Sequence, residues 1–208
     1  VEGSKPDITE RAVQVDAPRR TQLLRHLIHS EKWSRVLVFV ATKHAAEIVA
    51  DKLRKAGIDA EPFHGELSQG KRTQVLRDFK SAGVQVVVAT DVAARGLDIQ
   101  ALPVVVNYDL PRSAVDYTHR IGRTGRAGEP GLALSFISPG TEAHFSLIEK
   151  RQKTSVQREQ APGFEVLNSE LPTQPGGCSG GIKGLRPSKK DKLREAARLL
   201  AEKPPDDA

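Results

Sequence analysis

Three arginines recur at every third position in segment 119–128 (HRIGRTGRAG), as Arg120, Arg123 and Arg126. On a helix or its continuing turn, side chains at this spacing project from neighbouring positions. Glycines at positions 122, 125 and 128 allow the backbone to approach another surface closely. Fixed guanidinium groups on such a surface suit charge stabilisation of a transferring phosphoryl group. A solvated basic helix end is the alternative, although three glycines at this spacing disfavour a stable helix.

A second polar segment, residues 89–99 (ATDVAARGLDI), follows a strongly apolar run and contains Thr90, Asp91, Arg95 and Asp98. Loops at the end of a buried parallel strand commonly form binding sites, so this segment is a candidate site. Taken singly, Asp91 or Asp98 is more often a helix cap or an ion-pair partner of Arg95.

Residues 65–72 (GELSQGKR) nearly match the phosphate-binding loop of NTPases. That loop requires Ser or Thr after its lysine to bind Mg²⁺, and Arg72 occupies the position here. The segment also lies where a helix is expected to have begun, at Ser68. We therefore expect neither a nucleotide cradle of this kind nor a metal site in the chain.

The elements that position these segments are read from hydrophobic runs. Residues 36–40 (VLVFV) and 84–89 (VQVVVA) are too apolar to alternate, which is typical of parallel strands covered on both faces. Further strands are expected at 58–63, 103–107 and 132–137, and helices at 44–55, 68–80 and 113–121. This alternation predicts an α/β fold, an open, mostly parallel sheet with helices on both faces. Ligands bind such sheets at the C-terminal strand ends, where the segments above lie.

Composition limits the class of protein. The 208 residues carry 32 Lys plus Arg against 26 Asp plus Glu, and the net charge of +6 favours an anionic partner such as nucleic acid. Aromatic residues make up only 4%, which disfavours binding by base stacking and favours backbone contacts. No apolar run approaches the ~18 residues of a membrane span, and no secretory signal is present. A lone Cys178 forms no internal disulfide. We therefore expect a cytoplasmic protein without membrane contact.

The chain is expected to be a fragment of a longer protein, because it begins at Val1 and contains no methionine. Composition changes after residue 158: residues 1–158 are expected to form the domain, and 159–208 a Pro/Gly-rich linker and basic tail. Residues 151–208 hold 11 Lys plus Arg and 8 Asp plus Glu, net +3, which predicts added affinity for nucleic acid without a role in the fold. Residues 188–203 have the pattern of a short amphipathic helix, and its packing on the domain is the alternative.

Four segments in this order and spacing resemble motifs IV, IVa, V and VI of DEAD-box RNA helicases: 39–42 (FVAT), 69–72 (QGKR), 89–99 and 119–128. The resemblance covers roughly residues 1–155 and implies the second, C-terminal RecA-like lobe of such an enzyme. The Gln motif, phosphate loop, Asp-Glu-Ala-Asp box and Ser-Ala-Thr of the first lobe are absent from this sequence. The details, including 159–164 (EQAPGF), most resemble the bacterial RhlE-like branch.

The resemblance also implies roles for individual residues. Arg123 and Arg126 would contact the γ-phosphate of ATP, with Arg126 as the arginine finger. Asp98 and the adjacent Gly96 would contact the ribose, and His119 would couple the nucleotide to the first lobe. Single-stranded RNA would be held through its backbone, without reading of bases, by Thr42, Gly65, Gln69, Arg72 and Thr90.

The sequence thus predicts half of an ATP-dependent RNA helicase, in which ATP and RNA close two lobes and RNA is locally unwound. The N-terminal lobe would bind most of the ATP and the Mg²⁺, so this chain alone is expected to hydrolyse no ATP. The alternative is a non-catalytic RNA-binding or regulatory module of the same fold, and a DNA-acting relative is a weaker third hypothesis. A phosphate loop and an Asp-Glu-Ala-Asp box upstream would favour the enzyme.

Overall fold

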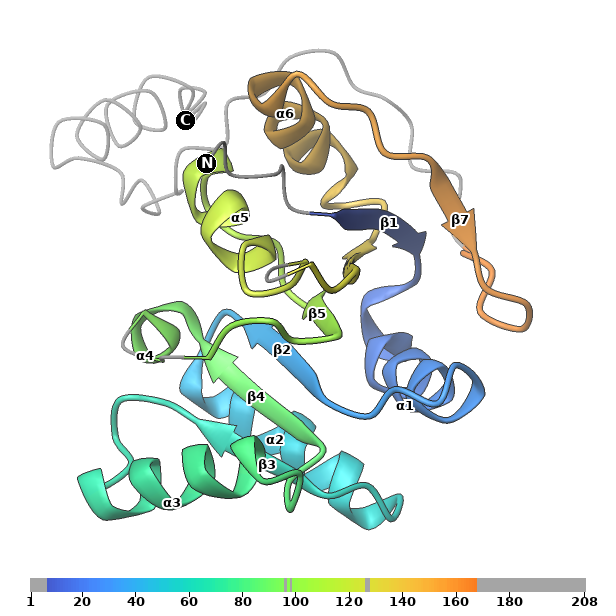
Figure 1. Cartoon of the computed structure of the whole chain (residues 1–208). Coiled ribbons are helices and arrows are strands. Elements are labelled where there is room, and N and C mark those ends of the chain that lie inside the picture. Colours follow the sequence, from blue (N-terminus) through green and yellow to red (C-terminus); the bar gives the residue numbers. More distant parts are fainter. Residues whose placement is uncertain (1–6, 96, 98, 126–127, 168–208) are drawn as a thin grey trace, which may run out of the picture. The chain divides into compact units, whose positions relative to one another are not determined.

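The computed structural model describes residues 7–95, 97, 99–125 and 128–167 (Figure 1). The chain divides into two compact units, Val1–Leu171 and Pro172–Ala208. All described residues belong to the first unit. The expected helix at 188–203 and most of the expected linker and tail therefore lie outside the described residues.

A parallel sheet forms the centre of the first unit. Its seven strands in the described part lie in the order β3-β4-β2-β5-β6-β1-β7, and every pair is parallel. The bounds are β1 (Ile8–Gln14), β2 (Val36–Val40), β3 (Ala60–Phe63), β4 (Val86–Thr90), β5 (Val104–Asn107), β6 (Gly131–Ile137) and β7 (Arg158–Gln160). The predicted α/β fold with a parallel sheet is confirmed.

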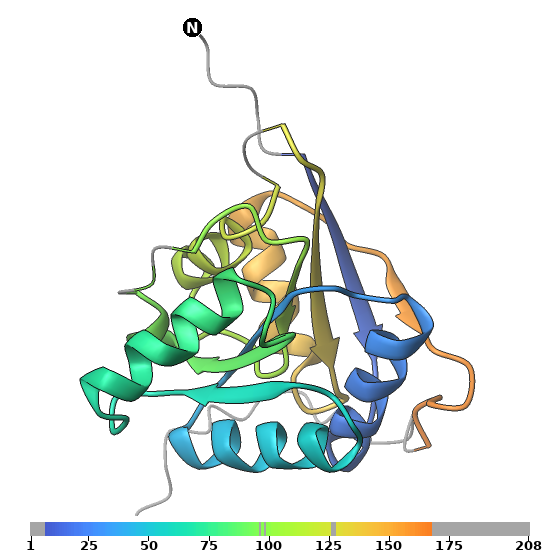
Figure 2. The same ribbon diagram turned by 60° about the horizontal axis from the view of Figure 1, so that its bottom comes forward.

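Helices cover both faces of the sheet (Figure 2). One face packs against α1 (Arg20–Ser30), which follows a 3-10 turn at Ala17–Arg19, and against α2 (Lys43–Lys55). The other face packs against α3 (Gln69–Lys80), α4 (Asp91–Ala94), α5 (Ala114–Ile121) and α6 (Glu142–Gln152). Within β2, Val38 joins the first core while Leu37 and Phe39 join the second. Every position of this strand is buried, which explains its unbroken apolar run.

Short polar side chains begin the helices that follow strands. The hydroxyl of Thr42 accepts a hydrogen bond from the amide of Ala45 at 3.1 Å, and that of Ser68 accepts one from Lys71 at 3.2 Å. Ser113 caps α5 in the same way. Each cap satisfies an amide at a helix start and fixes the direction of the chain as it leaves the sheet. The predicted cap at Ser68 is confirmed.

The fold continues past the boundary expected at residue 158, which falls on the first residue of β7. Ala161 and Phe164 pack against the core on the α1 side of the sheet. The guanidinium of Arg19 lies 5.0 Å from the ring centroid of Phe164. Residues 161–167 therefore attach to the domain rather than starting a free linker.

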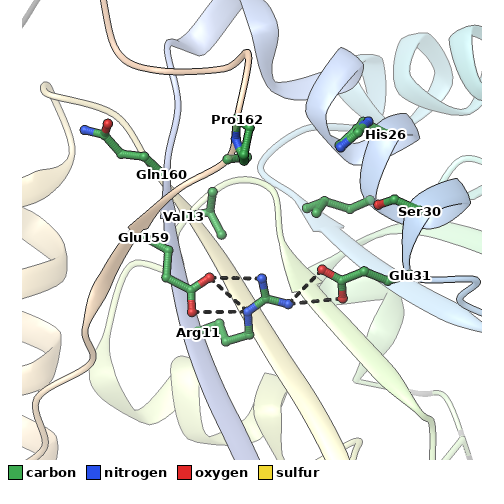
Figure 3. Close-up of a pocket in the computed structure, with 10 residues that line it drawn as sticks. Arg11, Val13, His26, Ser30, Glu31, Glu159, Gln160 and Pro162 are labelled. Carbon is green, nitrogen blue, oxygen red and sulfur yellow. Dashed lines mark hydrogen bonds and ion pairs between the residues drawn. The ribbon is translucent and has the colours of Figure 1, made fainter.

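A cavity of about 190 Å³ lies between α1 and the segment that begins with β7 (Figure 3). Arg11 of β1 lies between two carboxylates there, with its Nη1 3.0 Å from Glu31 Oε1 and its Nη2 2.9 Å from Glu159 Oε2. Burial opposes the charge, but hydrogen bonds to Glu159 and Glu31 outweigh it and raise the pKa of Arg11. These contacts tie β7 and the end of α1 to β1.

None of the described helices is long and apolar enough to span a bilayer.

Candidate functional site

The C-terminal ends of three neighbouring strands bring predicted RNA-binding residues to one edge of the sheet. Gly65 lies two residues beyond β3, Thr90 ends β4, and Thr42 lies two residues beyond β2. The register pairs Phe63 with Ala89 and Val40 with Thr90, so the three positions are nearly level. Because adjacent strands lie ~4.8 Å apart, they form a short row, which we call the strand-end row.

Two further predicted residues extend this row onto α3. Gln69 and Arg72 lie on its first turns, three residues apart and therefore on one side of the helix. The Arg72 guanidinium lies 5.7 Å from the ring centroid of Phe63, the last residue of β3. Its Nε is buried and has no hydrogen-bond partner among the described residues. The structure thus gathers all five predicted RNA-binding residues, while their contact with RNA stays a prediction.

An ion pair and a hydrogen bond attach the loop carrying Gly65 to α2. Lys43 pairs with Glu66, and this hydrogen bond holds the pKa of Glu66 below its usual value. His64 Nε2 lies 2.6 Å from Glu47 Oε1, and its ring is buried. His64 Nδ1 has no partner among the described residues. His64 thus links the end of β3 to α2.

A polar pocket lies between α4 and α5, next to the strand-end row. It is lined by Phe39, Asp91, Ala94, Arg95, Asp116, His119, Arg120 and Arg123. The predicted nucleotide-coupling residue His119 is exposed on the last turn of α5. Arg95 Nη2 lies 3.2 Å from Asp116 Oδ1. A hydrogen bond from the Ser113 hydroxyl, reinforced by Arg95, lowers the pKa of Asp116.

Arg120 does not share the environment expected for three neighbouring arginines, because its side chain is only 3% exposed. Its Nε and Nη2 donate to the carboxylate of Asp91 at 2.7 and 2.6 Å. Its Nη1 donates to the side-chain oxygen of Asn107 and to the backbone oxygen of Asp109. The guanidinium also lies 4.8 Å from the Phe39 ring centroid. Arg120 is therefore a structural link between α4, β5 and α5.

Arg123 faces the segment that follows α4. Its Nη1 donates to the carbonyl of Leu97 at 2.6 Å and its Nη2 to that of Ala94 at 3.3 Å. It therefore holds the backbone before Gly96 and between the predicted ribose contacts Gly96 and Asp98. Those two residues and the predicted finger Arg126 lie outside the described residues, and their roles stay predictions.

The expectation of close backbone approach in segment 119–128 is met at Gly125. Its φ is +63°, and a Cβ there would lie 2.5 Å from Ile8 Cγ1 and 2.7 Å from the carbonyl oxygen of Asp7. A side chain would therefore displace the segment from β1.

Sequence reasoning missed Asp109 and the buried role of Arg120. Asp109 lies two residues beyond β5, as Thr42 and Gly65 do beyond their strands. The same criterion, a polar residue after a buried strand, could have identified it. Within the described ranges, no group of three or more His, Cys, Asp or Glu side chains is placed to hold a metal ion.

The sequence of the chain matches a helicase family and several DEAD-box RNA helicases. The family described as helicase conserved C-terminal domain matches residues 19–128. The DEAD-box ATP-dependent RNA helicase CshA of Geobacillus kaustophilus is 39% identical over 160 residues, which are 77% of this chain and 34% of that protein. The ATP-dependent RNA helicase CshA of Listeria monocytogenes is 40% identical over 153 residues, 74% of this chain and 29% of that protein. The chain spans about a third of the length of these relatives.

Solved structures give the same result. Escherichia coli DEAD-box protein SrmB, bound to regulator of ribonuclease activity A, matches with a TM-score of 0.75 and 33% identity over 82% of this chain and 100% of that chain. A DEAD box protein from Methanococcus jannaschii matches with a TM-score of 0.69 and 37% identity over 74% of this chain and 42% of that one. Saccharomyces cerevisiae Dbp5 bound to RNA and ADP BeF3 matches with a TM-score of 0.68 and 30% identity, over 76% and 42% of the two chains.

Proposed function

Since the chain belongs to the helicase conserved C-terminal domain family, as the C-terminal lobe of a DEAD-box RNA helicase, we propose that the protein containing it couples ATP hydrolysis to local unwinding of RNA. This lobe supplies RNA backbone contacts and arginines, and an N-terminal RecA-like lobe of the same protein supplies the phosphate loop. The observation that carries the proposal is the junction of Thr90 and Asp91, where the strand-end row meets the arginine-lined pocket.

RNA binding is assigned to the strand-end row with Gln69 and Arg72. Backbone contacts of this kind set the register of a strand but read no base, so binding is indifferent to sequence. The Arg72 side chain supports the assignment, since its Nε has no hydrogen-bond partner among the described residues and a phosphate oxygen would satisfy a charged donor of this guanidinium. The solved complex of the relative Dbp5 with RNA and ADP BeF3 supports binding of both ligands by the family.

Nucleotide contact is assigned to the pocket and to the segment after it. Arg126 is the arginine finger that meets charge developing on the γ-phosphate, and Arg123 assists it. Both η nitrogens of Arg123 already donate to backbone carbonyls, which favours Arg126 for the finger. Gly96 and Asp98 contact the ribose, and His119 faces the other lobe. ATP and Mg²⁺ are held mainly by that lobe, where Mg²⁺ neutralises phosphate charge.

The test is single-turnover ATP hydrolysis by the two-lobe protein at saturating ATP and RNA. Arg126→Ala removes a planar, permanently charged fork from the γ-phosphate, so kcat should fall by about 10³ to 10⁵. Arg126→Lys should recover little, because a point charge does not reproduce the two-pronged geometry. RNA affinity without nucleotide should stay unchanged, since the RNA contacts lie elsewhere.

Arg151→Ala, at an exposed arginine of α6, is the matched control and should hydrolyse ATP at the wild-type rate. A change of less than about threefold for Arg126→Ala, the scale of a surface substitution, would reject the finger. If Arg126→Ala hydrolyses ATP normally and Arg123→Ala does not, Arg123 is the arginine finger.

Two finer points belong to the proposal. Residues 159–164 support placement in the RhlE-like branch, which the distribution of this segment among sequenced relatives would test. A non-catalytic RNA-binding module remains the alternative, and a wild-type two-lobe protein that binds RNA without hydrolysing ATP would favour it.

A further inference from the structure

Asp109 makes hydrogen bonds to residues of three elements around the site, β2, α1 and α5. It lies beyond the end of β5, with a side chain that is 22% exposed. Its amide donates to the carbonyl of Phe39 in β2 at 3.1 Å. Its carboxylate and its carbonyl each accept further hydrogen bonds, on opposite sides of the site.

The carboxylate holds the turn that presents Thr42. Asp109 Oδ2 accepts a hydrogen bond from the amide of Ala41 at 2.8 Å, and Ala41 directly precedes Thr42. Beyond the last residue of β2, this amide is held by a side chain from the neighbouring strand's loop instead of by the strand ladder. Asp109 Oδ1 lies 2.7 Å from Arg20 Nη1, which ties the same carboxylate to the start of α1.

The carbonyl of Asp109 holds the arginine segment. It accepts a hydrogen bond from Arg120 Nη1 at 2.6 Å. Arg120 in turn donates two hydrogen bonds to the carboxylate of Asp91, the residue after Thr90. In the sequence, Arg120 directly follows His119 and precedes Arg123 by three residues. Removal of one partner from a buried guanidinium strongly destabilises the folded protein. The position of the Arg120 guanidinium is therefore coupled tightly to the positions of its acceptors.

Resting on the proposed function, we propose that Asp109 is a positioning residue that couples the RNA contacts to the arginine segment. Displacement of the Thr42 turn by RNA moves the Asp109 carboxylate through the Ala41 amide. The same residue moves Arg120 through its carbonyl, and Arg120 carries Asp91 and the end of α5 with it. RNA occupancy thereby adjusts His119 and Arg123 without touching them.

The experiment is Asp109→Asn in the two-lobe protein, with the ratio of RNA-stimulated to unstimulated ATP turnover as the readout. Asparagine keeps the size but has one acceptor oxygen in place of two. The charged Arg20 donor competes better for that oxygen, so the Ala41 amide faces the asparagine NH₂ group and loses its acceptor. We expect the stimulation ratio to fall about tenfold, a coupling of the usual size. A purely structural role would lower thermal stability and leave this ratio unchanged.

Two control variants separate the alternatives. Glu159→Gln makes the same carboxylate-to-amide change at the partner of Arg11, far from the site in the sheet order, and should keep the wild-type ratio (Figure 3). Arg20→Gln removes the ion pair to Asp109 but leaves the Ala41 bond, and should also keep the ratio. A loss in Arg20→Gln equal to that in Asp109→Asn would overturn the proposal, as would a wild-type ratio in Asp109→Asn.

A double-mutant cycle with Thr42→Ala adds an independent readout. If Asp109 acts through the Thr42 turn, the two effects on RNA stimulation should be non-additive, and additive effects would contradict this route. Should Asp109→Asn fold poorly, Asp109→Glu keeps the charge, displaces the carboxylate by one methylene and should show the same loss. Absence of RNA stimulation in the wild-type protein would instead count against the proposed function itself.

Discussion

Arg120 and Arg123 show how position along one segment assigns opposite environments to the same residue type. Arg120 points inward and has its three nitrogens bonded to Asp91, Asn107 and Asp109. Arg123, three residues later and beyond the end of α5, lines the pocket and donates to carbonyls at the end of α4 and in the segment after it. Spacing alone does not separate the two, since the direction of each side chain depends on where α5 ends against the sheet.

A methyl group at Gly65 provides a sharp test of the strand-end row. Nothing lies within 4 Å of a Cβ built there, and its φ is not in the left-handed region, so Gly65→Ala should fold with wild-type stability. If the backbone of Gly65 meets an RNA phosphate or sugar, the methyl group keeps the strand away. RNA affinity of the two-lobe protein should then fall about tenfold, or 1.4 kcal/mol. Fluorescence anisotropy with a labelled single strand and a thermal melt would measure the two quantities.

The matched control is Gly70→Ala, on the first turn of α3, where a Cβ also meets nothing within 4 Å. Removal of a helical glycine should stabilise the lobe by roughly 0.5 to 1 kcal/mol and leave RNA affinity unchanged. Wild-type affinity in Gly65→Ala would remove Gly65 from the RNA contacts.

At the scale of elements, sequence periodicity located the central strands because they are buried on both faces. It missed β1 (ITERAVQ), in which charged Glu10 and Arg11 interrupt the apolar pattern. Arg11 is accommodated by Glu31 and Glu159, and Glu10 accepts a hydrogen bond from the Tyr117 hydroxyl. Those partners come from distant parts of the chain, so a local window contains no sign of them.

Contacts between distant parts of the chain also determine β7 and part of the site, and a local window of sequence does not contain them. The strand has three residues, too few for a period, and it exists because Arg158 is held by Glu142 and Glu149 of α6. Single residues at strand ends, such as Thr42 and Thr90, could be located from sequence since parallel strands bring their ends together. The link through Asp109 could not be, because it runs through a backbone carbonyl.

The α6–β7 contact predicts an acid-sensitive part of the stability. The hydrogen bond from Arg158 is the largest cause that lowers the pKa of Glu149 from 4.5. A carboxyl with a lowered folded pKa stabilises the fold above its unfolded value, and this contribution is lost as pH falls through the folded value. Glu149→Gln should therefore melt at a lower temperature than wild type at pH 7, and the difference should shrink as pH falls below 4.5.

Melting temperatures across this pH range, with Glu129→Gln at an exposed carboxyl as control, measure the effect. The control should follow the wild-type profile. A constant difference between Glu149→Gln and wild type at all pH values would mean that Glu149 contributes through packing instead of charge.

At the scale of the whole molecule, the question is where the domain ends and the tail begins. Composition places the change near residue 158, yet the ring of Phe164 lies 5.5 Å from that of His26, and Leu167 donates its amide to Asp16 at 3.1 Å. Arg19 also donates to the carbonyl of Glu165. Residues 161–167 therefore contribute apolar burial and hydrogen bonds to the α1 side of the domain.

We call residues 161–167 the strap. Two truncations distinguish the contribution of this strap from that of the tail. Deletion of 168–208 should leave the melting temperature within about 2 °C of the full chain, since stability changes below ~0.5 kcal/mol shift a domain of this size no further. Deletion of 161–208 also removes Phe164, whose partial burial is worth roughly 1 to 2 kcal/mol, and should lower the melting temperature by about 5 °C.

RNA affinity of the two-lobe protein should fall equally in both truncated chains, because the basic tail is absent from both. Equal melting temperatures for the two truncated chains would show that the strap adds nothing to the fold. A large drop after deletion of 168–208 alone would instead favour a tail that packs on the domain, and unchanged RNA affinity would contradict its role as a second RNA contact.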